Sequence, residues 1–140
     1  MGFYGAYKDV FDAAKAAIEK KSSIKSVLLG EQFSYDLLPK AVVNALPSGI
    51  SQGALGDLLE VKVSFSVVLV ISEYEPKDWF QDIISVMADA VDAVLADRTL
   101  GGKAADCVPV SFAPGEIKFE NKLFYGGEIR FQAILYYPSN

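Results

Sequence analysis

The residues of this chain that could do chemistry are mainly carboxylates on one segment with helical periodicity. Four aspartates share the polar side of that segment: Asp78, Asp82, Asp89 and Asp92. No lysine or arginine stands three or four residues from any of them, so their charge is not balanced locally before Arg98. Carboxylates can hold a hard cation, but no loop with calcium-type spacing accompanies these. We interpret this acidic face as solvated surface or as a surface for a neighbouring subunit's basic groups. Metal binding is the least supported interpretation of these carboxylates.

Nucleophilic chemistry has little support in the composition. The chain contains no histidine, which excludes a Ser-His-Asp triad, a Cys-His pair and most zinc sites. Its one cysteine, Cys107, stands beside Val108 in a strand-like segment. The sequence identifies no residue that would lower the pKa of this thiol. We therefore expect Cys107 to be a buried small hydrophobe, and the chain not to be an enzyme. No catalytic, cofactor-binding or metal-binding residue is predicted.

A phosphate loop is also excluded, although Gly101-Gly102-Lys103 invites the comparison. Ala104 stands where such a loop requires serine or threonine, and a helical pattern precedes the glycines instead of a strand. The position of the first motif glycine is occupied by Asp97. Gly101-Gly102 instead indicates the end of a helix.

Composition bounds the class of protein. The 140 residues suit a single domain, and 51% hydrophobic residues are enough for one core. A net charge of −5 argues against nonspecific nucleic-acid binding, which needs a basic surface. No signal peptide or membrane-length apolar run is present, and a single cysteine rules out an internal disulfide. We expect a soluble intracellular protein without cofactors.

Two helices are predicted from apolar periodicity. Residues 4–21 place apolar side chains on one face and charges that can pair locally on the other, namely Lys8 with Asp12 and Lys15 with Glu19. Residues 77–96 carry the acidic face described above and begin just after Pro76, which suits a first helical turn.

Strands are predicted between and after the helices. Residues 59–73 alternate most clearly, and their outward face becomes apolar at Val68 and Val70, as if covered there by another subunit. Three strands are expected after residue 106, with a break at Pro114-Gly115 and a turn at Glu120-Asn121-Lys122. Pro109 confines the first of them to an edge, a strand start or a bulge.

The first part of the chain is less clear. Residues 24–29 suit a short strand, and residues 37–46 a turn or short helix. Residues 47–57 contain three glycines and one proline, which predicts a flexible loop. The element order as a whole predicts one α+β domain, a mostly antiparallel β-sheet with two main helices packed on one face.

Aromatic residues are numerous near both ends of the chain. Most are expected in the core, and the surplus suits protein–protein contacts. A stacking platform for single-stranded nucleic acid would need interleaved basic residues, and the C-terminal strands offer only Lys118, Lys122 and Arg130.

The C-terminal half resembles a known family. A helix ends in Asp97-Arg98-Thr99-Leu100-Gly101-Gly102, leads into Val108–Val110, and is followed by Tyr125-Gly126-Gly127 at the start of the last strand. This pattern resembles the tail terminator (tail-completion) proteins of long-tailed bacteriophages and related neck components. The resemblance does not extend to residues 22–58. It implies a small α+β protein that assembles as a six-membered ring, caps the tail tube and joins tail to head, without an active site.

The resemblance also implies partners: copies of the chain, the tail tube protein and a head-completion or neck protein. Genomic DNA would pass through the lumen without specific binding, which suits an acidic ring. The protein would be located in the virion, and in the host cytoplasm during assembly, with no membrane partner. Ring subunits use two different patches, and the candidate interface residues are Asp82, Asp89, Asp92, Val68, Val70, Ser51, Gln52 and Leu55. The alternatives are another neck or tube component such as a head–tail joining protein, or a small-ligand-binding accessory domain.

Overall fold

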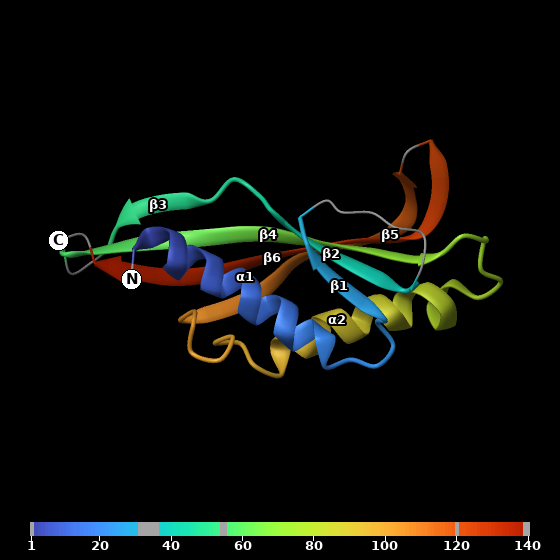
Figure 1. Cartoon of the computed structure of the whole chain (residues 1–140), viewed down its shortest axis with the longest axis horizontal. Coiled ribbons are helices and arrows are strands. Elements are labelled where there is room, and N and C mark those ends of the chain that lie inside the picture. Colours follow the sequence, from blue (N-terminus) through green and yellow to red (C-terminus); the bar gives the residue numbers. More distant parts are fainter. Residues whose placement is uncertain (1, 31–36, 54–55, 120, 139–140) are drawn as a thin grey trace.

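One six-stranded sheet organises the chain in the computed structural model, which describes residues 2–30, 37–53, 56–119 and 121–138. The strands are β1 (Ser26–Leu29), β2 (Lys40–Ala45), β3 (Gly49–Gln52), β4 (Leu58–Ser72), β5 (Asp106–Phe119) and β6 (Lys122–Pro138). They lie in the order β1-β2-β4-β6-β5, and β3 pairs with the beginning of β4 (Figure 1). Only the β1–β2 pair is parallel among these strands. The predicted α+β class is confirmed.

The first helix, α1 (Phe3–Glu19), forms because its apolar residues recur on one face. That face buries Val10, Phe11, Ala14, Ala17 and Ile18. The predicted local ion pairs are present on the other face: Lys8 Nζ lies 2.8 Å from Asp12 Oδ2, and Lys15 Nζ lies 3.5 Å from Glu19 Oε2.

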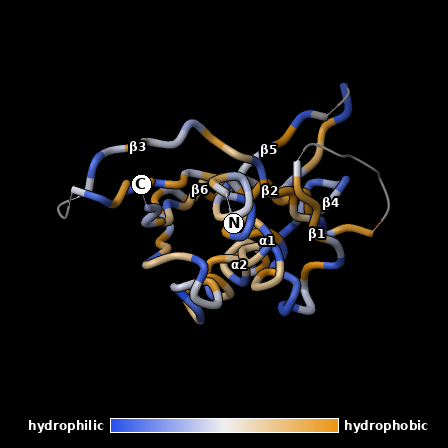
Figure 2. The backbone as a smooth tube through the Cα atoms, turned by 60° about the vertical axis from the view of Figure 1, so that its left-hand side comes forward, coloured by the Kyte–Doolittle hydropathy of each residue, from blue (hydrophilic) through white to orange (hydrophobic). Residues whose placement is uncertain are grey.

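The second helix begins later than predicted. A π-helical turn, η1 (Phe80–Ile84), leads into α2 (Ser85–Leu95). Asp78 Oδ1 accepts hydrogen bonds from the backbone N–H groups of Phe80 and Gln81, at 3.1 and 3.3 Å, so this carboxylate caps the first turn. Both helices cover the same face of the sheet (Figures 1 and 2).

The core lies between the helices and the two central strands. Alternate residues of β4 and β6 face the helices and meet in register, among them Phe65 with Phe131 and Val67 with Ile129. The Phe65 and Phe131 rings stack with centroids 5.3 Å apart, and Phe11 of α1 packs on Phe65 at 5.6 Å.

The uncertain N-terminal region is settled by strand pairing. The expected short strand at residues 24–29 is confirmed as β1. The turn or short helix expected over residues 37–46 is wrong for residues 40–45, which form β2. This strand lies between β1 and β4, and these two neighbours satisfy its backbone hydrogen bonds. The predicted loop over residues 47–57 is wrong for β3, which pairs with residues 59–62 of β4.

The C-terminal half forms two long strands instead of three. No break occurs at Pro114-Gly115, because Gly127 and Gly126 of β6 lie opposite and pairing continues through them. The expected turn is present where Phe119 pairs with Lys122 and Asn121 takes a φ of 67°. Pro109 stands on the edge strand beside a register shift, as its ring requires.

Candidate functional site

The acidic face of the second helix is divided by its contacts. Asp82 and Asp92 are exposed, and neither forms an ion pair within the described residues. Asp89 is half-buried, and its Oδ2 accepts a hydrogen bond of 2.6 Å from Ser23 Oγ in the connection between α1 and β1. Asp82 and Asp92 are therefore available to a partner, whereas Asp89 also holds the fold together.

Val68 and Val70 lie on the sheet face opposite the helices. Val70 is 0% exposed in the single chain, and Val68 is half-buried. Val42 and Phe124 are also buried on this face. The chain itself thus covers Val70, and no second subunit is needed to explain its apolar character.

The segment that contains Ser51, Gln52 and Leu55 is a strand for part of its length. Ser51 and Gln52 are exposed on β3, and Gln52 Nε2 donates a hydrogen bond of 2.8 Å to the carbonyl oxygen of Gly56. Leu55 lies outside the described residues. Ser51 and Gln52 are therefore presented on a paired strand, where a partner could reach both side chains.

An apolar groove is the main feature that the sequence did not predict. It has a volume of about 600 Å³ and lies between the first half of α1 and the ends of β1 and β2. Its lining, called here the α1 groove, consists of Phe3, Tyr4, Tyr7, Lys8, Phe11, Leu29, Gly30, Val43 and Ala45. Most of the aromatic residues are expected in the core, and Phe11 is buried there, whereas Tyr4 is 77% exposed. Their excess over what one small core needs was the available signal.

A second apolar surface lies at the connection between β4 and η1. Tyr74 and Phe80 are 78% and 75% exposed. The connection is held to the β5–β6 hairpin on its inner side, where Lys122 Nζ lies 2.8 Å from Glu73 Oε1. The Trp79 ring also packs edge-on against Tyr125, with centroids 5.9 Å apart. These contacts fix the base of the connection and leave its outer aromatic side chains in solvent.

The turn that contains Gly101 and Gly102 has a structural role. Leu100, Gly101 and Gly102 all take positive φ, and Asp97 Oδ2 accepts a hydrogen bond of 2.8 Å from the Gly101 N–H. This turn ends the helix, as the sequence predicted, and binds no phosphate through a P-loop arrangement because no strand leads into it.

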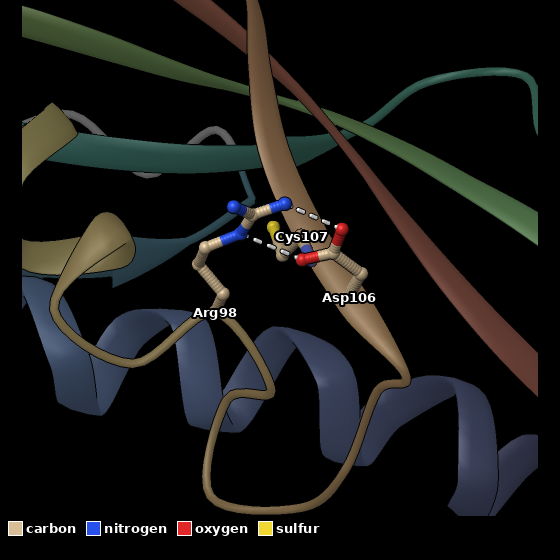
Figure 3. A network of polar contacts seen from close by, with 3 residues as sticks. All are labelled: Arg98, Asp106 and Cys107. Carbon is tan, nitrogen blue, oxygen red and sulfur yellow. Dashed lines mark hydrogen bonds and ion pairs between the residues drawn. The ribbon is translucent and has the colours of Figure 1, made fainter.

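The same connection is closed by a bidentate ion pair (Figure 3). Arg98 Nε and Nη2 donate to the two carboxylate oxygens of Asp106, at 2.8 and 2.6 Å. The hydrogen bond from Arg98 lowers the pKa of Asp106. The next residue, Cys107, is fully buried as predicted, and burial raises the pKa of its thiol to about 12. A thiol with this pKa is protonated at neutral pH and is a poor nucleophile.

Other sites of chemistry are not apparent in the described ranges. Over residues 2–30, 37–53, 56–119 and 121–138, no group of three or more Cys, Asp or Glu side chains could hold a metal ion. Within the same ranges, no helix combines the length and apolar character of a membrane span. The surfaces described above are therefore the candidate functional features.

Comparison with known proteins identifies no family. No protein-family model and no curated protein matches this chain.

Proposed function

We propose that this chain is a structural virion assembly protein, a tail terminator whose ring caps the tail tube. In this role it ends tube polymerisation and joins tail to head. One observation carries the proposal: the three most exposed large apolar side chains of the described residues lie on two separate surfaces, Tyr4 on one and Tyr74 with Phe80 on the other, although further apolar side chains such as Val110 are exposed elsewhere. Exposed apolar surface of this kind is typical of protein contacts. A ring subunit needs two such surfaces, since each of its contacts joins different patches.

The proposed mechanism is complementarity of shape and charge, with no bond chemistry. Exposed β3 residues and the free carboxylates Asp82 and Asp92 are further surfaces for the tail tube protein and the head-completion protein. A net charge of −5 supports a lumen that does not retain DNA, because like charges repel. Another neck component, such as a head–tail joining protein, would use the same physical features.

Light scattering after size exclusion tests this proposal. The chain is measured alone and then with the tail tube protein of the same virus. We expect a hexamer, or a ring that forms only with the tube, visible by negative-stain electron microscopy at tube ends. A monomer that does not bind the tail tube protein would contradict the proposal. A ring that binds neck protein but not the tube would favour the neck component.

The α1 groove supports a second candidate, a small-ligand-binding domain. Its volume of about 600 Å³ falls within the range of small-molecule sites, and most of its lining is apolar. A ligand that binds the folded state raises the melting temperature, and the increase grows with the logarithm of its concentration above Kd. Thermal stabilisation of a monomer by an apolar small molecule, lost in the variant Ala45→Glu at an exposed residue of the groove lining, would favour this candidate over the ring.

A further inference from the structure

The α1 groove has one cation, Lys8, and no carboxylate among its described lining residues. Lys8 Nζ lies 2.8 Å from Asp12 Oδ2, a carboxylate outside the lining, which offsets part of its charge. The N-terminus of α1 adds positive character, because Gly2 provides no side-chain cap and no acidic residue occupies the first turn. The uncapped N–H groups there form the positive end of the helix dipole.

The connection after β4 has the opposite character. Its two exposed aromatic side chains, Tyr74 and Phe80, stand among the exposed carboxylates of Glu75, Asp78 and Asp82, with Lys77 as the one cation of that stretch. We call Tyr74, Glu75, Asp78, Phe80 and Asp82 the acidic tip. The acidic tip is apolar and negative, whereas the α1 groove is apolar, has no described carboxylate in its lining and lies at the uncapped N-terminus of α1.

These two surfaces lie apart along the molecule, because the groove extends from the N-terminus of α1 toward the middle and the acidic tip lies at the other end. In Figure 1 the N-terminus of α1 is toward the left of the long axis, and the connection between β4 and η1 is at the far right. One copy therefore cannot bring its own acidic tip into its own groove. Two different patches that lie apart produce a heterologous, head-to-tail contact, which closes into a ring when the rotation between copies allows it.

We infer that the α1 groove binds the acidic tip of a second copy of this chain. In this contact Tyr74 and Phe80 enter the groove, and the tip carboxylates face Lys8 and the N-terminus of α1. The inference rests on the proposed ring and names the surfaces that would form it.

Strand addition at the sheet edges is a poorer way to join copies. The edge strand β5 contains Pro109 and Pro114, neither of which has an N–H to donate, and its register shifts beside Pro109. The opposite edge strand, β1, has only four residues. Side-chain contacts through the groove avoid both obstacles.

A mixing experiment tests the inference with two surface variants. Phe80→Glu removes an exposed aromatic side chain from the tip and leaves the groove intact. Tyr4→Glu places a carboxylate at the groove and leaves the tip intact, and an acidic residue in the first turn favours α1. Each variant alone should be monomeric by analytical ultracentrifugation, with association weakened at least about thirty-fold. An equimolar mixture should form a dimer and no larger species, because one intact contact remains per pair.

Charge reversal on α1 provides a matched control. Lys8→Glu should raise the dissociation constant about tenfold, since it replaces the groove cation by an anion. Lys15→Glu makes the same charge reversal, and Lys15 is, like Lys8, the cation of an i,i+4 ion pair. Lys15 does not line the groove. It should associate like the wild type. Circular dichroism checks that all variants remain folded.

Three results would overturn the inference. They are assembly of both single variants at wild-type affinity, a mixture that stays monomeric while the wild type assembles, and a wild type that stays monomeric up to about 1 mM, where even weak contacts populate. Stabilisation by a small apolar molecule without change in mass would assign the groove to a ligand instead. If rings form and the two substitutions do not weaken their assembly, the inference fails and the proposed function stands. If the mixture dimerises but the wild type never binds the tail tube protein, the inference stands and the proposed function fails.

Discussion

Ser23 donates a hydrogen bond of 2.6 Å to Asp89, and this bond joins the connection between α1 and β1 to the middle of α2. Asp89 is therefore part of the helix layer and not a free member of the acidic face. A substitution at Asp89 changes folding as well as any interface, so it cannot by itself test partner binding.

Replacing Asp89 should destabilise the protein, whereas replacing Asp92 should not. Asp89→Ala removes a half-buried, charge-assisted hydrogen bond and should lower the free energy of unfolding by about 1–2 kcal/mol. Asp92→Ala, one turn later and exposed, should stay within about 0.5 kcal/mol of the wild type. Urea denaturation followed by circular dichroism measures both. Equal effects of the two substitutions would show that the bond to Ser23 contributes nothing.

Gly126 and Gly127, which lie within the first half of β6, should not tolerate alanine. A Cβ atom at Gly126 would collide with the carbonyl oxygen of Leu69, and one at Gly127 would collide with the carbonyl oxygen of Ala113 and with the end of the Met87 side chain. Gly126→Ala meets rigid backbone and should cost about 3 kcal/mol or more. Gly115→Ala is the control, since Gly115 pairs with Gly126 but has open space around its Cβ position. Thermal unfolding of the three variants gives the ranking, and a stable Gly126→Ala protein would contradict the register of β4 and β6.

The buried thiol should make stability fall at high pH. Burial raises the pKa of Cys107 from 9.0 to about 12, so between these values the folded state binds more protons than the unfolded state. The contribution is complete below pH 9 and is lost as the pH rises toward 12. Cys107→Ala should remove this part of the pH dependence. Denaturation at pH 8 and pH 10.5 measures it, and an identical pH dependence in the variant would contradict the burial.

The same burial predicts slow thiol labelling. At pH 8 a maleimide should react with Cys107 only as fast as the protein opens, and at the rate of a free thiol in urea. Labelling of the folded protein at the rate of a free thiol would show that the β5 edge opens readily.

The ion pair between Arg98 and Asp106 should shape acid stability. The hydrogen bond from Arg98 lowers the pKa of Asp106, so its stabilisation is present above about pH 4 and is lost as the pH falls through the lowered value. Arg98→Met should return the pKa of Asp106 toward its ordinary range and make the decline in acid shallower. Carboxyl NMR titration measures this pKa directly. Lys103→Met, which removes the looser pair with Asp9 at 3.9 Å, should leave Asp106 unchanged.

Local periodicity determined much of the fold from the sequence alone. The apolar stripe of α1, the alternation of β4 and the buried thiol of Cys107 are consequences of which side chains can leave water, and each is present as predicted. The edge position of Pro109 follows from its missing N–H in the same local way.

Tertiary structure alone decided which strands pair and which surfaces remain open. Residues 40–45 form a strand because β1 and β4 lie on either side of them. The sequence of that segment does not predict which strands it pairs with. Val70 is covered by the chain itself, Asp89 is held by a serine 66 residues away, and Tyr4 stays in solvent beside a groove. Backbone pairing and burial depend on contacts between segments far apart in the chain, whereas periodicity reports only which face of a segment is apolar.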